Sequence, residues 1–175
     1  MKTILTVATA LITGLFFSTS AIAEDAKPAE WLFVHTAETA EMTSATTLVM
    51  PVTRDIFAFT DRPNRLHTYM TAQQFVSLWD EGEEGDTFRS DPPNAVLTWV
   101  DGEKMKEAEV LITDAKVVGV DNSALVHYSV NVEAGAVFSG VSSRVSLFVD
   151  GDCFCRVFCL IKVGSCERDD RENWK

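Results

Sequence analysis

Five polar residues in two proline-containing turns are the set in this sequence best suited to bind a charged ligand. They are Asp61, Arg62, Arg65, Asp91 and Asn94. Arginine binds carboxylate or phosphate through two parallel hydrogen bonds, so the set would suit a small anionic or polyhydroxy ligand if the two turns meet at one end of the fold. The alternative is that the acids cap their own turns and pair with the arginines, since Asp and Asn readily hydrogen-bond nearby backbone N–H groups.

Two of these acids, Asp61 and Asp91, also define an enzymatic alternative, a small hydrolase that uses both carboxylates. A concave pocket and a raised carboxyl pKa would support that reading. The sequence adds no positive sign of catalysis. It has no Gly-x-Ser-x-Gly elbow and no glycine-rich phosphate loop, and His35, His67 and His127 lie on separate predicted elements. We therefore predict no catalytic residue and no cofactor, and favour a non-catalytic binding protein.

The acidic segment 80–86 is the one candidate for a calcium site. It carries five carboxylates and two glycines, and Ca²⁺ takes oxygen ligands. The spacing does not match an EF-hand loop, which places acids at alternate positions and a glutamate at the twelfth. We predict a solvated charged loop here and no metal site.

Four cysteines lie close to the C-terminus: Cys153, Cys155, Cys159 and Cys166. In an exported protein an even number of cysteines indicates disulfides, and four cysteines allow three pairings. Zinc is the alternative, but the spacing lacks the paired C-x2-C of structural zinc sites. We predict one or two disulfides in segment 151–175. Free thiols, and a tail that does not fold, stay open as alternatives.

Residues 1–23 have the pattern of a signal peptide. Lys2 precedes an apolar run over 4–17, and Ala21-Ile22-Ala23 is a small-x-small cleavage site. The run is shorter than the roughly 20 apolar residues that span a bilayer, although a retained anchor is the alternative. We expect cleavage after Ala23 and a periplasmic or secreted protein in which 24–175 forms one domain.

The charge balance narrows the classes of partner. The chain has 26 acidic and 15 basic residues and a formal net charge of −11. Nucleic-acid binding depends on Lys and Arg that neutralise phosphate, so the balance argues against nucleic acid, and it argues against anionic membranes for the same reason. The most apolar later stretch, 145–163, is interrupted by four charged residues, so we predict no transmembrane segment after signal cleavage.

One short helix is predicted over residues 72–81. Thr71 as N-cap and Gln74 three residues later form a capping box, while Met70 and Phe75 have the spacing of a hydrophobic staple. Gly82 would end the helix.

The remaining pattern predicts strands separated by turn residues. We expect strands at 31–36, 46–52, 56–60, 95–100, 108–118, 124–132 and 141–149. Alternation places Trp31, Phe33 and His35 on one face of the first, and Ala124, Val126, Tyr128, Val130 and Val132 on one face of the strand 124–132. The aromatic residues expected in the core, rather than on a sugar-binding surface, are Trp31, Phe57, Phe59, Trp79 and Trp99. Residues 36–47 lack a clear period and are predicted to be loop or weak edge strand. Strands at this spacing with one helix indicate a mainly β fold, an antiparallel β-sandwich or alternatively a partly closed β-barrel.

The middle of the chain contains a distinctive series of motifs: Phe59-Thr60-Asp61-Arg62-Pro63-x-Arg65, Met70-Thr71 with Phe75 and Trp79, Phe88, Asp91-Pro92-Pro93-Asn94-Ala95-x-Leu97, and Ser146-Leu147-Phe148-Val149-Asp150. In these motifs the chain resembles an uncharacterised family of small exported bacterial proteins. It covers most of residues 31–150. It implies export and a single domain, and it implies no chemistry.

Taken together, the sequence favours an exported binding or interaction module for an unknown small ligand or protein partner. The hydrolase that uses Asp61 and Asp91 is one alternative, and a disulfide-stabilised accessory protein is another. An exposed apolar patch of several hundred Å² would favour a protein partner. A surface without a patch or a pocket would favour the accessory protein.

Overall fold

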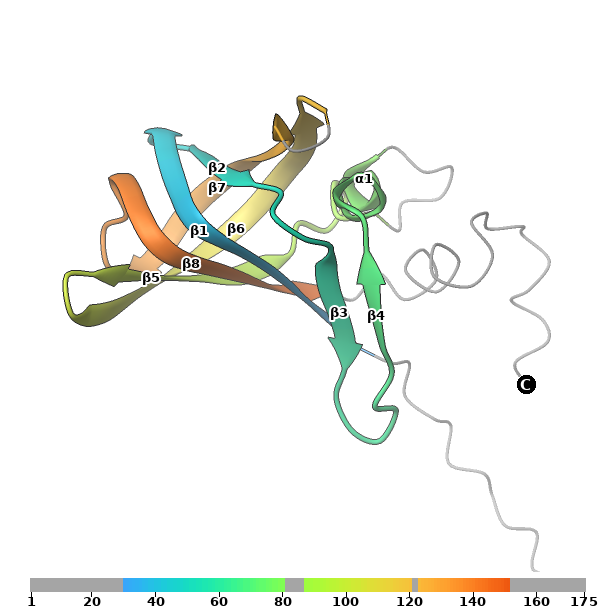
Figure 1. Cartoon of the computed structure of the whole chain (residues 1–175). Coiled ribbons are helices and arrows are strands. Elements are labelled where there is room, and N and C mark those ends of the chain that lie inside the picture. The colour runs from blue at the N-terminus through green and yellow to red at the C-terminus, as the bar shows by residue number, and fades with distance from the viewer. Residues whose placement is uncertain (1–29, 81–86, 121–122, 152–175) are drawn as a thin grey trace, which may run out of the picture.

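The computed structural model describes residues 30–80, 87–120 and 123–151. Within these residues the chain forms eight strands and one helical segment (Figure 1). The strands are β1 (Trp31–Ser44), β2 (Thr47–Pro51), β3 (Ile56–Thr60), β4 (His67–Met70), β5 (Asn94–Asp101), β6 (Lys104–Val118), β7 (Leu125–Gly135) and β8 (Gly140–Gly151). The helical segment is α1 (Ala72–Val76), continued by the 3₁₀ turn η1 (Ser77–Trp79).

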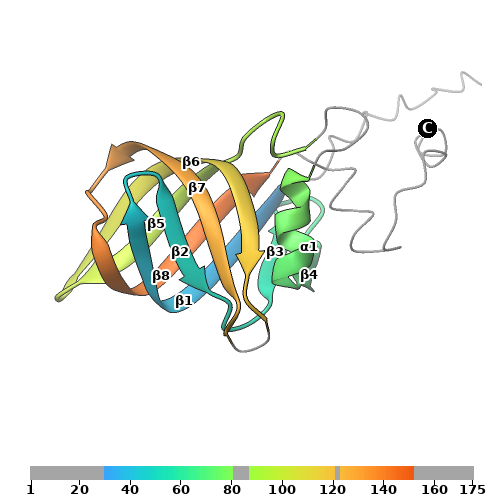
Figure 2. The same ribbon diagram turned by 90° about the horizontal axis from the view of Figure 1, so that it is seen from above.

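All eight strands belong to one antiparallel sheet that curls back on itself. Their order is β2-β7-β6-β5-β8-β1-β3-β4, and an additional pairing of β2 with β1 closes the first six into a ring (Figure 2). The long strand β1 makes this possible, because Trp31–Val34 pair with β3 while Glu41–Ser44 pair with β2. The prediction of a mainly β, antiparallel fold with one short helix is confirmed, and the ring places the fold nearer to the partly closed arrangement.

Side-chain alternation follows the curl of the ring. Trp31, Phe33 and His35 share one face of β1 as predicted, and that face is buried inside the ring. On β7 the predicted inward face is confirmed for Val126 and Tyr128, which are fully buried. It fails at Val132, which is 50% exposed. A register shift follows directly after Val132, between the pairs Val110–Val132 and Glu109–Ala134, so the alternation does not continue to the end of the strand.

Two strand predictions were incomplete. Residues 36–44, predicted as loop or weak edge strand, continue β1. The sequence shows no clear apolar period here because the buried positions Ala37 and Ala40 carry small side chains. The short strand β4 was missed, since its only buried residue is Met70 and its pairing with β3 depends on tertiary contact. Such long-range pairing has no local signature.

The capping box of the helix is confirmed. The Gln74 backbone N–H donates to Thr71 Oγ1 at 3.2 Å, and the Thr71 N–H donates to Gln74 Oε1 at 2.9 Å. Such a cap contributes about 1 kcal/mol. The helix ends earlier than predicted, however. The α-helix stops at Val76 and the 3₁₀ turn at Trp79, so Gly82 does not end it. The Ser77 hydroxyl donates to the Gln74 carbonyl at 2.8 Å and so occupies one helix-end acceptor.

The helical segment covers one end of the ring and packs on aromatic rings of the core (Figure 2). The ring centroid of Phe75 lies 5.4 Å from that of Phe33, and the centroid of Trp79 lies 4.8 Å from that of Phe88. Gly151 at the end of β8 leaves room for two of these rings. A Cβ there would lie 2.8 Å from Phe33 Cε2 and 2.7 Å from Phe88 Cζ. These aromatic side chains and the buried residues of the strands form one core cluster inside the ring.

Candidate functional site

Hydrogen bonds within the turn account for the conformation of the first predicted turn, residues 61–65. The Arg62 N–H donates to Asp61 Oδ1 at 2.6 Å, and the Arg65 N–H donates to the Asp61 carbonyl at 3.1 Å. Arg65 adopts a left-handed conformation with φ of 52°. The five predicted ligand-binding residues, Asp61, Arg62, Arg65, Asp91 and Asn94, are all exposed, and the structure describes no ion pair among them.

The two turns belong to separate parts of the sheet. The end of β3 leads into the first turn, and the second turn leads into β5. Strands β1 and β8 lie between β3 and β5, so three strand spacings, about 14 Å, separate these strands. The described contacts do not join the turns into one cluster, and neither Asp61 nor Asp91 lines either of the two pockets described below. Asn94 alone lines a groove, which is described below.

Five apolar side chains form a continuous line across the outside of the sheet. Each faces its neighbour in the strand register, and the line runs across β4, β3, β1, β8 and β5. Its members are Tyr69, Phe57, Val34, Phe148 and Val96. We call this set the outer apolar row. Tyr69 is 66% exposed, Phe148 42% and Val96 39%.

Phe57 and Phe59, predicted to be core residues, lie half-buried on this outer side. Their rings stack with centroids 5.5 Å apart, and the ring of Tyr69 lies 5.2 Å from that of Phe57. The alternation of Ile56–Thr60 separates two faces correctly, but the small residues Ala58 and Thr60 are the buried ones. Choosing the buried face of this strand by the size of its side chains therefore gives the wrong face. The other aromatics predicted for the core, Trp31, Trp79 and Trp99, are buried.

At the β5 end, the outer apolar row leads into a groove of about 440 Å³. Leu32, Val96 and Phe148 supply apolar side chains to its lining. The same groove is lined by exposed acids of three strands, which we call the acidic rim: Glu109, Glu133 and Asp150. The structure describes no ion pair for any of the three. The groove thus offers apolar contact area beside unneutralised negative charge.

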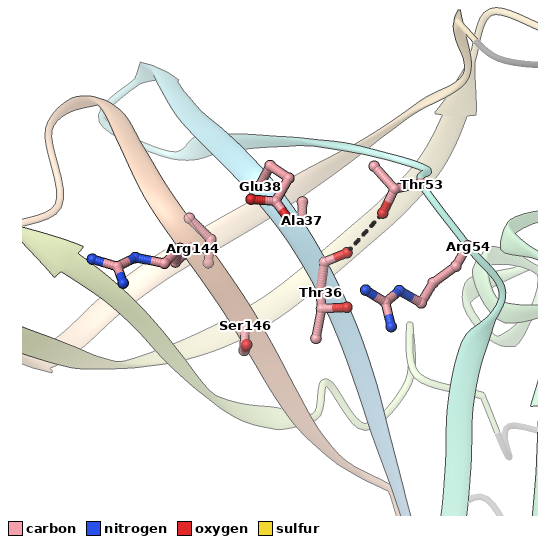
Figure 3. Close-up of a pocket in the computed structure, with 8 residues that line it drawn as sticks. Thr36, Ala37, Glu38, Thr53, Arg54, Arg144 and Ser146 are labelled. Carbon is pink, nitrogen blue, oxygen red and sulfur yellow. Dashed lines mark hydrogen bonds between the residues drawn. The ribbon is translucent and has the colours of Figure 1, made fainter.

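A second and smaller pocket, of about 180 Å³, lies on the same outer side over β1 and β8 (Figure 3). Arg54 and Arg144 flank it, and Thr36, Glu38 and Ser146 lie between them. The Thr53 hydroxyl donates to the Thr36 carbonyl at 3.2 Å and so ties the segment that carries Arg54 to β1. We call this site the two-arginine pocket. Sequence reasoning missed it because Arg54 and Arg144 are 90 positions apart and belong to no motif.

Arg144 is held in an uncommon backbone conformation. Its φ is 51°, and it lies where the register between β5 and β8 shifts, between the pairs Thr98–Ser146 and Val100–Ser143. Bulges of this kind redirect a side chain, and a non-glycine residue in the left-handed region costs about 1 kcal/mol or more. Such outliers gather at functional sites.

Replacing Arg144 by glycine should therefore stabilise the fold. We expect Arg144→Gly to raise the free energy of unfolding by roughly 0.5–1 kcal/mol, after allowance for the greater freedom of glycine in the unfolded chain. Urea denaturation of the full chain would measure it, with Arg144→Gln as the control that removes the charge and keeps the strain. A loss of stability in the glycine variant would contradict the strain argument.

The histidines do not form a site. The His35 ring is buried in the ring interior, with Nδ1 2.8 Å from the Tyr128 hydroxyl and Nε2 3.1 Å from the Pro51 carbonyl. Burial lowers the pKa of His35 to about 4, against a smaller raising effect of the hydrogen bond to Pro51, and burial raises the pKa of Tyr128. His67 and His127 lie on β4 and β7. Within the described ranges no group of three His, Cys, Asp or Glu side chains is placed to hold a metal ion.

Several predictions concern residues outside the described ranges. These are the signal peptide over 1–23, most of the acidic segment 80–86, and the disulfide candidates Cys153, Cys155, Cys159 and Cys166. They stay predictions. In the part of the chain that is described, no helix has both the length and the apolar character needed to cross a membrane.

Comparison with known proteins gives no match to a family model, a curated protein or a solved structure. The resemblance to exported bacterial proteins therefore stays a prediction. A functional assignment for this chain has to start from the outer apolar row, the acidic rim and the two-arginine pocket.

Proposed function

We propose that this protein is an exported, non-catalytic binding module that recognises a segment of another protein through the outer apolar row. The bound segment carries apolar side chains together with lysine or arginine. The observation that carries the proposal is the row itself: five apolar side chains in register on five neighbouring strands, three of them substantially exposed.

Exposure of this row is costly unless something covers it. Single apolar residues on a surface need no explanation, but a contiguous apolar patch is typical of an interaction site. Burial of apolar surface yields about 25 cal/mol per Å², and tyrosine and phenylalanine are enriched at the centre of interfaces. Tyr69, Phe57 and Phe148 supply such side chains, and they lie on rigid strands that lose little freedom on binding.

The acidic rim determines the kind of partner. Glu109, Glu133 and Asp150 lie beside the apolar lining of the groove, and the whole chain has a formal net charge of −11. A second copy of the chain would bring like charges together, which disfavours self-association. A segment with Lys or Arg next to its apolar residues would instead neutralise the rim, and the charge would also speed the encounter.

Site-specific photo-crosslinking tests this function in the exporting cell. A benzoyl-phenylalanine placed at Phe148 lies within the row, and one placed at Val137, which is 85% exposed, lies outside it and serves as the matched control. We expect an adduct from position 148 and none from position 137. Sequencing of the crosslinked peptide should show apolar residues beside Lys or Arg.

Charge variants complete the test. The pair Glu109→Gln and Asp150→Asn, made in the benzoyl-phenylalanine protein, should reduce the yield of adduct several-fold, because the neutralised rim no longer attracts the basic residues. An adduct to segment 152–175 of the same chain, or to a second copy, would show that this segment or copy covers the row and would refute the proposed partner. Equal labelling at both positions, or none at position 148, would refute the proposal.

A further inference from the structure

We propose that the two-arginine pocket binds a small dicarboxylic acid that carries an amino group, with L-glutamate as the representative of this class. The pocket shares no lining residue with the groove at the end of the outer apolar row. The inference therefore does not depend on the proposed protein partner.

The placement of the two arginines calls for a ligand with two anionic ends. Arg144 belongs to β8, which pairs along one edge of β1, and Arg54 lies in the connection from β2 to β3, both of which pair along the other edge. The two backbones are thus about two strand spacings, roughly 10 Å, apart. Figure 3 shows the arginines on opposite sides of Thr36, with Glu38 and Ser146 between them. In Figure 3 the Arg54 side chain extends toward Thr36, whereas the Arg144 side chain extends away from Thr36. A single carboxylate does not span such a site, whereas a short dicarboxylate contacts both guanidinium groups once the long, exposed Arg144 side chain turns over the pocket.

Both arginines are available to a ligand. Arg89 is engaged by Asp114, with its Nη2 3.1 Å from Oδ1, but neither Arg54 nor Arg144 has an ion pair within the described ranges. That is notable in a chain with 26 acidic and 15 basic residues. Guanidinium groups bind carboxylates through paired hydrogen bonds, so two unpaired arginines beside one pocket form a suitable receptor for two carboxylates.

Glu38 favours a ligand that carries an amino group. Its carboxylate lines the pocket between the arginines and would repel a plain dianion, but it would attract an ammonium group on the same molecule. The charges of two arginines and one glutamate complement two carboxylates and one amine. The hydroxyls of Thr36 and Ser146 add hydrogen-bonding groups between the charges. The volume of about 180 Å³ suits a molecule of this size.

Titration of the full-length protein with L-glutamate, followed by amide NMR shifts, tests the inference. We expect saturable shifts at Thr36, Glu38 and Ser146, with weaker binding of glutarate, which lacks the amine. Arg54→Gln and Arg144→Gln should each weaken L-glutamate binding about tenfold or more. Glu38→Gln should remove the preference for L-glutamate over glutarate. Arg62→Gln, which removes the same charge in the β3–β4 turn, should change nothing.

Three results would overturn the inference. Shifts that never saturate, or that sodium chloride reproduces at equal ionic strength, would show a general salt effect. Equal losses in Arg54→Gln and Arg62→Gln would show that no defined pocket is involved. Unchanged affinity in both pocket variants, with melting curves showing that they fold, would exclude the pocket. Phe148→Ser alters the outer apolar row and should leave L-glutamate binding unchanged. The ligand proposal and the protein-binding proposal can therefore fail independently of each other.

Discussion

Lowering the pH from 7 to 4 is expected to reduce the free energy of unfolding by about 3 kcal/mol through the His35 side chain alone. Burial holds the pKa of His35 at about 4 in the folded protein, while the ordinary value is 6.5. Between these values the unfolded chain takes up a proton that the folded chain does not bind, so stability falls as the pH falls. Below about pH 4 the folded protein also binds the proton and the loss levels off.

The hydrogen bonds of His35 explain why the neutral form is favoured. A carbonyl only accepts, so Nε2 must donate to the Pro51 carbonyl, and Nδ1 of the neutral ring then accepts from the Tyr128 hydroxyl. Protonation would place a charge in the ring interior, where His35 is 1% exposed. The neutral imidazole instead joins β1, β2 and β7 inside the ring.

Urea denaturation at a series of pH values would measure the effect. The double variant His35→Phe with Tyr128→Phe removes the imidazole and the hydroxyl bonded to it, and should lose most of the decline between pH 6.5 and 4. At pH 7 we expect it to cost about 2 kcal/mol, because the Pro51 carbonyl loses its donor. His67→Gln, on the exposed strand β4, is the matched control and should keep the decline. An unchanged decline in the double variant would assign the acid sensitivity to other groups.

Local signals in the sequence predicted the local structure well. The capping box of Thr71 and Gln74 is visible in the sequence because its partners are three residues apart, and it forms as predicted. Strand β3 was predicted with its observed bounds, Ile56–Thr60, because alternation lasts for the whole strand. The second half of β1 was not predicted, since its backbone is held by β8 and β2, which are distant in sequence.

The outer surface was harder to predict than the core. Alternation separates two faces of a strand without saying which face is inside, and so Phe57 and Phe59 were placed in the core. The outer apolar row exists only because the registers of five strands align, and the two-arginine pocket only because β1 lies between β8 and the β2–β3 connection. The predicted cluster of Asp61 and Asp91 depends on long-range structure in the same way, since strand order decides which turns meet.

Replacing Trp79 by alanine is expected to lower the free energy of unfolding by about 4 kcal/mol. Trp79 is 1% exposed, its ring packs edge-on against those of Phe75 and Phe88, and its indole N–H donates to the Ile112 carbonyl at 3.2 Å. Trp79→Phe keeps an aromatic ring but leaves that carbonyl without its donor, and should cost about 2 kcal/mol. Urea denaturation would measure both, with Tyr69→Ala, 66% exposed, as a control within about 0.5 kcal/mol of the parent protein.

The same substitution should also weaken the outer surface. Among the described strands β4 pairs with β3 alone, and it leads directly into α1 through Met70 and Thr71. The packing of Trp79 therefore holds the strand that carries Tyr69. We expect Trp79→Ala to reduce crosslinking from position 148 under conditions where the variant is still folded. A cost below about 1 kcal/mol, or an unchanged adduct, would show that the helical segment covers the ring without holding it. Either result would show that strand pairing, and not the helical segment, holds the outer apolar row in place.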